Sequence, residues 1–477
     1  MKHKIRIALL CAPLLTGCTV GPDFVQPDSH APQGYLSDKE TLPQSDQRAV
    51  MGKQIEGDWW SQFHNKALDD VISAGLNGNH DIATAKARVA EAQDEVAAAE
   101  GGFWPQLSLD ATAGKQKYGK SLFGPSNFVI PPFAYYSVGP AVTLPLDIFG
   151  GTRRSVEEKQ ALEQYQEHEL NAAYLELSGN IVAQSLTLAA AHAQITALQQ
   201  ILDDDHRNIS LVEKAFKAGS VTQLDVLSAK SQLASDETLL PPLKQQESVA
   251  RHALSILAGK SPSEWSPPEF TLDQFTLPSE LPVSLPSELA HKRPDILAAE
   301  AQLHAASAAI GVATANMYPS ISLTGTLTQQ ALSPHDLFGA AANAWGFAAN
   351  ITQPLFEGGT LDAKRKAAKD HYQAALSTYQ QTVITSFGKV ADNLAAITHD
   401  GELLAAQQQA ANVARDSLAL ARKSYNAGNT GVLQVLDAER LYAQAQLGTS
   451  KIAAQRYLDT AQLFINLGGT TVPPAAK

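Results

Sequence analysis

Apolar residues along this chain follow two different spacings. Helical spacing, in which apolar residues recur every three or four positions, predicts helices within 68–100, 152–217 and 360–427. Alternation of apolar with polar or small residues, which is typical of half-buried strands, occupies about 105–149 and about 319–356. The pattern predicts a mainly helical chain with a smaller β part.

Two stretches of the chain match without a gap, Leu211–Ala234 and Leu420–Ala443. Each stretch predicts a helix that ends at an Ala-Gly pair and a second helix that begins a few residues later, because Gly readily adopts the left-handed conformation that ends a helix. The two helix hairpins have their tips at about 218–224 and about 427–433. This repeat indicates duplication of a whole half of the protein, since solenoid repeats span only about 20 to 50 residues.

The alternating segments predict four strands in two hairpins. The first strand, for example, alternates Leu107, Leu109 and Ala111 with Ser108 and Asp110. Strands of about 10 to 13 residues are long enough to cross a bilayer when tilted. Four strands cannot close into a membrane barrel, and lipid does not tolerate an open sheet edge, so several chains must share one barrel. A soluble sheet with protected edges is the alternative, because alternation is weak evidence in any single segment.

The helical segments are unusually long. From Thr152 to Lys217 the chain has no Pro and a single Gly, so one helix could extend for about 100 Å at about 1.5 Å per residue. The stretch from Thr360 to Ala427 is also free of Pro. Both are rich in Ala, Gln, Leu, Glu and Lys, which predicts long coiled-coil packing. Returning helices are expected over Leu224–Leu257, interrupted near Pro241, and over Val432–Leu467.

Residues 1–17 have the pattern of a lipoprotein export signal. A positive start is followed by an apolar segment, Ile7–Leu15, that is too short to remain as a membrane span. The next residues, Leu15-Thr16-Gly17-Cys18, resemble the bacterial lipobox, in which the Cys is diacylated and becomes the new N-terminus. An ordinary signal peptide with a chance Cys is the alternative. We expect a covalent lipid on Cys18, and the absence of Asp at position 19 favours the outer membrane.

The mature chain then divides into five predicted segments. Residues 18–57 form a lipidated tether rich in Pro and Gly, and a Pro-rich crossover at 261–293 separates two repeats. The repeats occupy 58–260 and 294–468, and 469–477 is a tail.

Charge and motif content exclude several classes of function. A net charge of −12 and an isoelectric point near 5.5, with no basic patch, argue against nucleic-acid binding. The sequence lacks an H-E-x-x-H pattern, a Gly-rich phosphate loop and a G-x-S-x-G elbow. Asp203, Asp204 and Asp205 point in different directions on a helix, so we expect a solvated face there rather than a metal site. We expect no enzyme activity, no metal and no cofactor apart from the lipid.

Several motifs together resemble the outer-membrane efflux proteins of tripartite pumps, a TolC-like family, and within it the lipoprotein branch paired with resistance-nodulation-division (RND) transporters. They are the lipobox, Asp58-Trp59-Trp60, Ala85-Lys86-Ala87-Arg88-Val89, Phe149-Gly150-Gly151, Arg293-Pro294-Asp295-Ile296, Pro354-Leu355-Phe356-Glu357-Gly358-Gly359 and both tip motifs. The resemblance covers nearly the whole mature chain. One departure is His80, where the family usually has Pro.

The resemblance implies a fold and a function. The fold would be a homotrimer, in which a twelve-stranded transmembrane β-barrel with four strands per chain continues into a twelve-helix periplasmic α-barrel. Such proteins conduct drugs or other small molecules passively across the outer membrane of Gram-negative bacteria. Their partners are a periplasmic adaptor and an energised RND-type transporter of the inner membrane. A channel of a protein-secretion system and a coiled-coil spacer lipoprotein without a pore are the alternatives.

The resemblance also implies site residues at the second tip. In relatives the periplasmic constriction is formed by a Leu and an Asp four residues later, and these positions match Leu433 and Asp437. Arg440 and Tyr425 are latch candidates. Spacing of four places Leu433 and Asp437 on one helix face, so a threefold axis would stack an apolar ring on a ring of carboxylates. The alternative is a solvated Asp437 that bonds to Arg440.

The tips are also the expected docking surface for the adaptor, with simple turn packing as the alternative. The residues concerned are Ala218, Gly219, Leu224 and Val226 at the first tip, and Ala427, Gly428 and Val435 at the second.

Overall fold

The computed structural model describes residues 19–469, apart from 30, 45, 54, 56 and 120–129. The expected signal peptide and the expected lipidation site, Cys18, lie outside the described residues. The described chain forms two compact units. The first comprises residues through Pro27, Arg88–Gln166 and Ala299–Tyr379, and the second comprises the rest.

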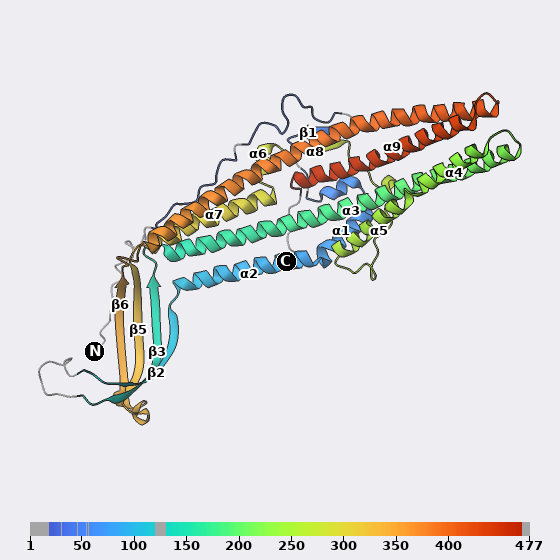
Figure 1. The fold of residues 1–477 in the computed structure, drawn as a ribbon. Helices are drawn as coiled ribbons and strands as arrows, with labels where there is room; N and C mark the ends of the chain where they lie inside the picture. The colour runs from blue at the N-terminus through green and yellow to red at the C-terminus, as the bar shows by residue number, and fades with distance from the viewer. Residues whose placement is uncertain are drawn as a thin grey trace. The chain divides into compact units, whose positions relative to one another are not determined.

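The first unit contains a four-stranded antiparallel sheet (Figure 1). Its strands are β2 (Gln106–Gln116), β3 (Phe133–Leu146), β5 (Ser320–Ala331) and β6 (Asn343–Thr352). They lie in the order β2-β3-β5-β6, so the two hairpins are joined side by side through β3 and β5. β2 and β6 are the edge strands of the sheet.

The strand register gives this sheet one apolar face and one polar face. Leu107 lies opposite Val142, and Leu327 lies opposite Trp345. Following these pairs across the sheet places one set of apolar side chains on the same face, because cross-strand partners share a face. The set comprises Leu107, Leu109, Val142, Leu144, Ile321, Leu323, Leu327, Trp345, Phe347 and Ile351. In a single chain most of these large side chains are exposed.

Four helices directly precede or follow the strands of the sheet in the chain, and two of them are very long. They are α2 (His80–Glu100), α3 (Gly151–Lys217), α7 (Pro294–Ala315) and α8 (Thr360–Asn426). α3 and α8 each have 67 residues without a break, which confirms the prediction of single long helices. The Asn79 side chain caps the start of α2 by accepting hydrogen bonds from the backbone N–H groups of Asp81 and Ile82.

The two helix hairpins repeat at a constant interval. α3 occupies 151–217 and α8 occupies 360–426, so the interval between their starts equals the interval between their ends. The returning helices keep this interval: α4 (Gln223–Glu237) starts, and α5 (Leu240–Leu257) ends, at positions equivalent to the start and the end of α9 (Val432–Asn466). The first returning helix is divided between Glu237 and Leu240, because Pro241 and Pro242 fit only the first turn of a new helix.

The second unit has an aromatic core next to the start of the first repeat. The short 3₁₀ helix η1 (Trp59–Phe63) and helix α1 (Lys66–Gly78) bury Trp59, Phe63 and Leu68 against Phe464 of α9. Arg293, directly before α7, is also buried here and donates a hydrogen bond of 2.5 Å to the carbonyl oxygen of Asn466.

Packing in the second unit begins earlier than the sequence predicts. The segment 18–57 was expected to be an extended tether, but β1 (Arg48–Met51) pairs in parallel with β4 (Glu280–Val283) of the Pro-rich crossover. Gln47 is buried and donates hydrogen bonds to Pro278 and Thr460. Sequence reasoning missed this pairing because each strand has only four residues, too few to show a period. The crossover also contains the short helix α6 (Pro286–Ala290).

Among the described helices, α3 and α7 are long and apolar enough to cross a membrane by length and composition alone. In each, about half of the apolar window is buried within the protein, 50% in α3 and 56% in α7. This burial is typical of core helices, so the two helices are weak evidence for a helical span.

The close approach of β3 and β5 at Gly139 makes this glycine a sensitive position. A Cβ atom at Gly139 would lie 2.1 Å from the carbonyl oxygen of Leu327 on β5, so the backbones would have to separate. We expect Gly139→Ala to destabilise the sheet by about 1–3 kcal/mol, the usual cost of overpacking, and to lower the unfolding temperature measured by circular dichroism.

Gly325→Ala is the matched control on β5, because a Cβ atom there would meet only a ring carbon of Phe347, at 3.9 Å. Equal unfolding temperatures for the two variants would contradict this account of the β3–β5 contact.

Candidate functional site

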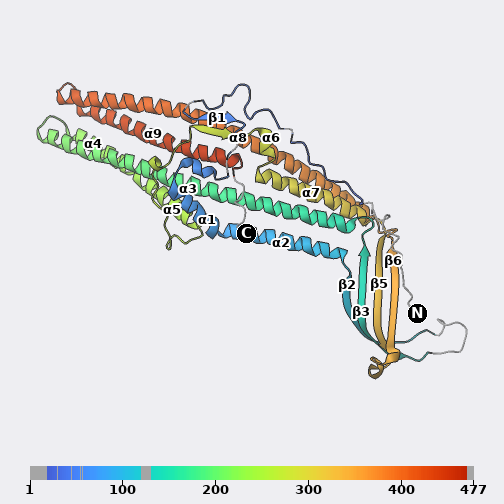
Figure 2. The ribbon, with the colours of Figure 1, turned by 180° about the vertical axis from the view of Figure 1, so that it is seen from behind.

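Two helix hairpins of the second unit end in similar tips, which lie at the same end of that unit (Figure 2). Gly219 and Gly428 have φ angles of 74° and 76°, the left-handed conformation predicted for both. At the first tip, Thr222 and Asp225 form a capping box that starts α4. The backbone of each tip is therefore fixed by a glycine stop.

Apolar side chains from both hairpins pack together behind the tips. One cluster joins Val212 of α3, Val226 of α4 and Val432 of α9, and a second joins Leu418 of α8 with Val435 and Ala438 of α9. Val226 and Val435, which were predicted to belong to the docking surface, are both buried. Their side chains pack behind the turns, as in the alternative, because the aliphatic run after each tip alternates between the exposed face and the helix contact.

The other predicted tip residues are at the surface. Ala218, Gly219, Ala427 and Gly428 are exposed, and Leu224 is 70% exposed. With this exposure, Leu224 contributes little to the packing of the described residues.

The predicted constriction residues lie on the exposed face of α9. Leu433 is 53% exposed, and the Asp437 side chain is 64% exposed. Arg440 donates a hydrogen bond of 2.8 Å to the Asp437 carboxylate. Tyr425 is half-buried and packs on both apolar clusters. The structure therefore brings Asp437 and Arg440 together, while Tyr425 does not share their exposed face.

A groove of about 530 Å³ lies beside Tyr425. α3 contributes polar residues to its wall, and α8 contributes Arg422, which forms an ion pair of 2.7 Å with Glu439 of α9. The lining residues are Asp204, Arg207, Asn208, Leu211, Arg422, Tyr425, Asn426, Val432 and Val435.

Sequence reasoning missed a buried carboxyl group near these residues. Asp205 was predicted to be on a solvated face, but it is only 7% exposed. Burial, and then the negative charge of Asp236 on α4, raise the pKa of Asp205 to about 7. The signal was present, since Ile201, Asp205 and Val212 fall on one apolar stripe of α3. Among the described residues, no group of three or more His, Cys, Asp or Glu side chains is arranged to hold a metal.

The second hairpin contains a similar pair of acids at a different level. Burial and a hydrogen bond shared with Asp459 of α9 raise the pKa of Asp400 on α8 to about 7. Both Asp459 carboxylate oxygens accept from Gln455.

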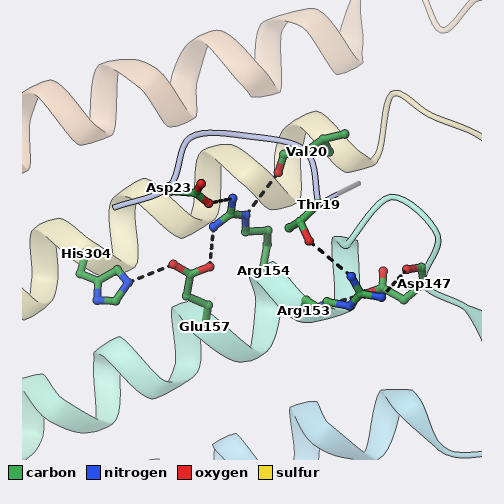
Figure 3. A network of polar contacts seen from close by, with 8 residues as sticks. All are labelled: Thr19, Val20, Asp23, Asp147, Arg153, Arg154, Glu157 and His304. Carbon is green, nitrogen blue, oxygen red and sulfur yellow. Dashed lines mark hydrogen bonds and ion pairs between the residues drawn. The ribbon is translucent and has the colours of Figure 1, made fainter. Parts of the chain in front are cut away.

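In the first unit, a buried arginine holds the start of the described chain (Figure 3). The Arg154 side chain is 4% exposed and donates to Asp23 at 2.6 Å, to Glu157 at 2.7 Å and to the carbonyl oxygen of Val20. Glu157 also contacts His304 at 3.0 Å, and Phe24 stacks on the His304 ring. Residues 19–27, which we call the N-terminal strap, are thus bound to α3 and α7.

These features define an internally duplicated helical protein with a small antiparallel sheet, and comparison with known proteins gives its family. The chain belongs to the outer membrane efflux protein family, whose model matches residues 71–260 and 285–469. It is therefore a protein of the outer membrane.

Relatives of known name support this assignment. The chain is 30% identical over 419 residues to the pyoverdine export outer membrane protein OpmQ of Pseudomonas aeruginosa, covering 86% of this chain and 87% of OpmQ. It is 28% identical over 456 residues to the cation efflux system protein CusC of Escherichia coli K12, covering 95% of this chain and 97% of CusC. The solved structure of the outer-membrane channel OprN has a TM-score of 0.86 at 28% identity and covers 95% of this chain and 99% of OprN.

The strap contacts predict a specific effect of removing Arg154. We expect Arg154→Met to release residues 19–27, because Asp23 and the Val20 carbonyl lose their donor. Hydrogen exchange of the strap amides, followed by mass spectrometry, should become at least about tenfold faster, as expected when about 1.4 kcal/mol of local stability is lost.

Lys159→Met is the matched control, because Lys159 lies on α3 like Arg154 and its ion pair with Glu95 of α2 is partly exposed, a kind of pair worth about 0–1 kcal/mol. If both variants left strap exchange unchanged, Arg154 would not be the residue that holds the strap.

Proposed function

We propose that this protein is the outer-membrane channel of a tripartite efflux pump, through which small molecules leave the periplasm passively. The observation that carries the proposal is the sheet with one apolar face and two edge strands, β2 and β6. Inside a lipid bilayer, the backbone N–H and C=O groups at such edges need hydrogen-bond partners from other strands. The sheet therefore fits a barrel that is closed by other copies of the chain. Three copies would supply twelve strands.

Family membership supports the same function, since OpmQ and CusC are described as export and efflux proteins. The substrate of this chain would be a small molecule or ion. An inner-membrane RND-type transporter would supply energy, and a periplasmic adaptor would connect it to the channel. No reaction and no cofactor are ascribed to the chain, apart from the proposed lipid on Cys18.

The tips support both contact with an adaptor and control of the channel. We assign adaptor docking to the exposed tip residues Ala218, Gly219, Leu224, Ala427 and Gly428, supported by Val226 and Val435 from behind. We assign the periplasmic gate to Leu433 and Asp437, with Arg440 as the latch of Asp437 and Tyr425 as its support. A threefold ring of Leu433 side chains would exclude water, and a ring of Asp437 carboxylates would favour cations.

The gate is tested by planar-bilayer conductance of the purified full-length protein. We expect a low wild-type conductance that rises several-fold in both Leu433→Ala and Asp437→Ala. Cation selectivity should fall in Asp437→Ala alone, because this variant removes the carboxylate ring.

Leu224→Ala is the matched control, because Leu224 occupies the position of the first tip that is equivalent to Leu433 in the second. It should leave conductance unchanged. Unchanged conductance in both gate variants would move the gate elsewhere, and a folded wild type without any conductance would favour the spacer lipoprotein over the channel.

A further inference from the structure

The buried acid Asp205 borders a small pocket between helices of both hairpins. A cavity of about 20 Å³, enough for about one water molecule, is bordered by Asp205 of α3, Asp236 of α4 and Glu439 of α9. One carboxylate oxygen of Asp205 is fully buried and has no hydrogen-bond partner among the described residues. An unpaired buried oxygen beside a second carboxylate is costly unless a proton lies between them.

The other charges around Asp205 are arranged unequally. On α3, Asp204 is paired with Arg207, and on α9 Glu439 accepts from Arg422 of α8 and from Asn208. Asp236 accepts a hydrogen bond from a neutral donor, Gln232, at 2.8 Å. Arg440 also borders the cavity, and it donates a hydrogen bond to the exposed Asp437. Thus the neighbouring acids Asp204 and Glu439 have cationic partners, while Asp205 and Asp236 face each other.

The duplication shows that helix packing does not require these acids. When the two hairpins are aligned by their helix bounds, Asp205 and Asp236 correspond to Ala414 and Ala445 of the second hairpin. The second hairpin instead has Asp400 and Asp459, which correspond to Ala191 and Ala250 of the first. Each hairpin therefore has one pair of acids between its two antiparallel helices. At the equivalent positions the other hairpin has alanines.

We propose that Asp205 and Asp236 form a proton-binding site, and that release of the shared proton draws Arg440 from Asp437 into the cavity. In the protonated state one carboxyl O–H donates to the other carboxylate, and Arg440 remains on Asp437. When the proton leaves to water, the cavity holds two facing carboxylates, which repel each other and attract the guanidinium of Arg440 at the cavity border. This site goes beyond conduction, because it couples pH to the contact between α3, α4 and α9.

The direction of the pH effect follows from the raised pKa of Asp205. The ordinary pKa of Asp205 is 3.8 and its pKa in the folded protein is about 7. At a pH between these two values, the folded chain holds a proton that the unfolded chain has lost. Stability therefore falls as pH rises from about 4 to about 7. Above about pH 7 the contact between α3 and α4 is at its weakest.

Hydrogen exchange of the full-length protein in detergent tests the site directly. Exchange of the α4 amides, corrected for the intrinsic pH dependence, is measured from pH 5.5 to 8.5 in the wild type and in Asp205→Asn/Asp236→Asn. We expect wild-type protection to fall at least about tenfold with a midpoint near pH 7, and protection in the variant to stay constant. Circular dichroism at each pH establishes that both proteins are folded.

Asp203→Asn/Glu237→Gln is the matched control, because it removes two exposed carboxylates from the same two helices. It should follow the wild type. The proposal is overturned if wild-type protection shows no transition in this range, or if the transition survives in Asp205→Asn/Asp236→Asn.

Conductance separates this inference from the proposed gate. If both hold, wild-type conductance rises between pH 6 and 8, and Asp205→Asn/Asp236→Asn removes that rise. A transition in exchange with constant conductance would support the proton site and overturn the movement of Arg440, while Leu433→Ala and Asp437→Ala test the gate on their own.

Discussion

The structure depends on the requirement that backbone N–H and C=O groups be paired wherever water is absent. Within the described chain, α3 and α8 satisfy this requirement internally over 67 residues each. In the sheet, neighbouring strands satisfy it for one another, but the outer edges of β2 and β6 have no strand beside them. The edge strands leave the sheet incomplete, and its apolar face has no cover within the described chain. The helices of one chain are therefore complete in their hydrogen bonds, while the sheet has two open edges. The proposed function requires several chains because their sheets must close one barrel.

Long periodic elements could be predicted from the sequence, and short or long-range contacts could not. The alternation at Leu107–Ala113 lies in β2, and the Pro-free stretches form α3 and α8, because each has many residues that repeat one spacing. The β1–β4 pairing lies beyond such reasoning, since strands this short show no period and the two partners come from different halves of the chain. Family resemblance, rather than periodicity, pointed to Leu433 and Asp437.

The site residues show the same limit. Tip glycines could be identified because one conformation requires them, but the burial of Val226 and Val435 depends on which side of α4 and α9 meets a neighbour. Asp205 was misjudged because three consecutive acids suggest a solvated surface. Its position on an apolar stripe of α3 was the stronger signal, since the side of the helix on which Asp205 lies faces the neighbouring helices.

The interruption between α4 and α5 gives the two hairpins different mechanical properties. α9 is a continuous rod of 35 residues, whereas the equivalent length of the first hairpin consists of two shorter rods that meet just before Pro241. At this joint Thr238 and Leu239 donate to carbonyl oxygens three residues back rather than four, and Pro241 and Pro242 have no N–H to donate, so the joint bends under a smaller torque than an intact helix does. A force applied at both tips would therefore bend the first hairpin at its joint before it bends α9. The continuous α9, which carries Asp437 and Arg440, would move as one rigid helix.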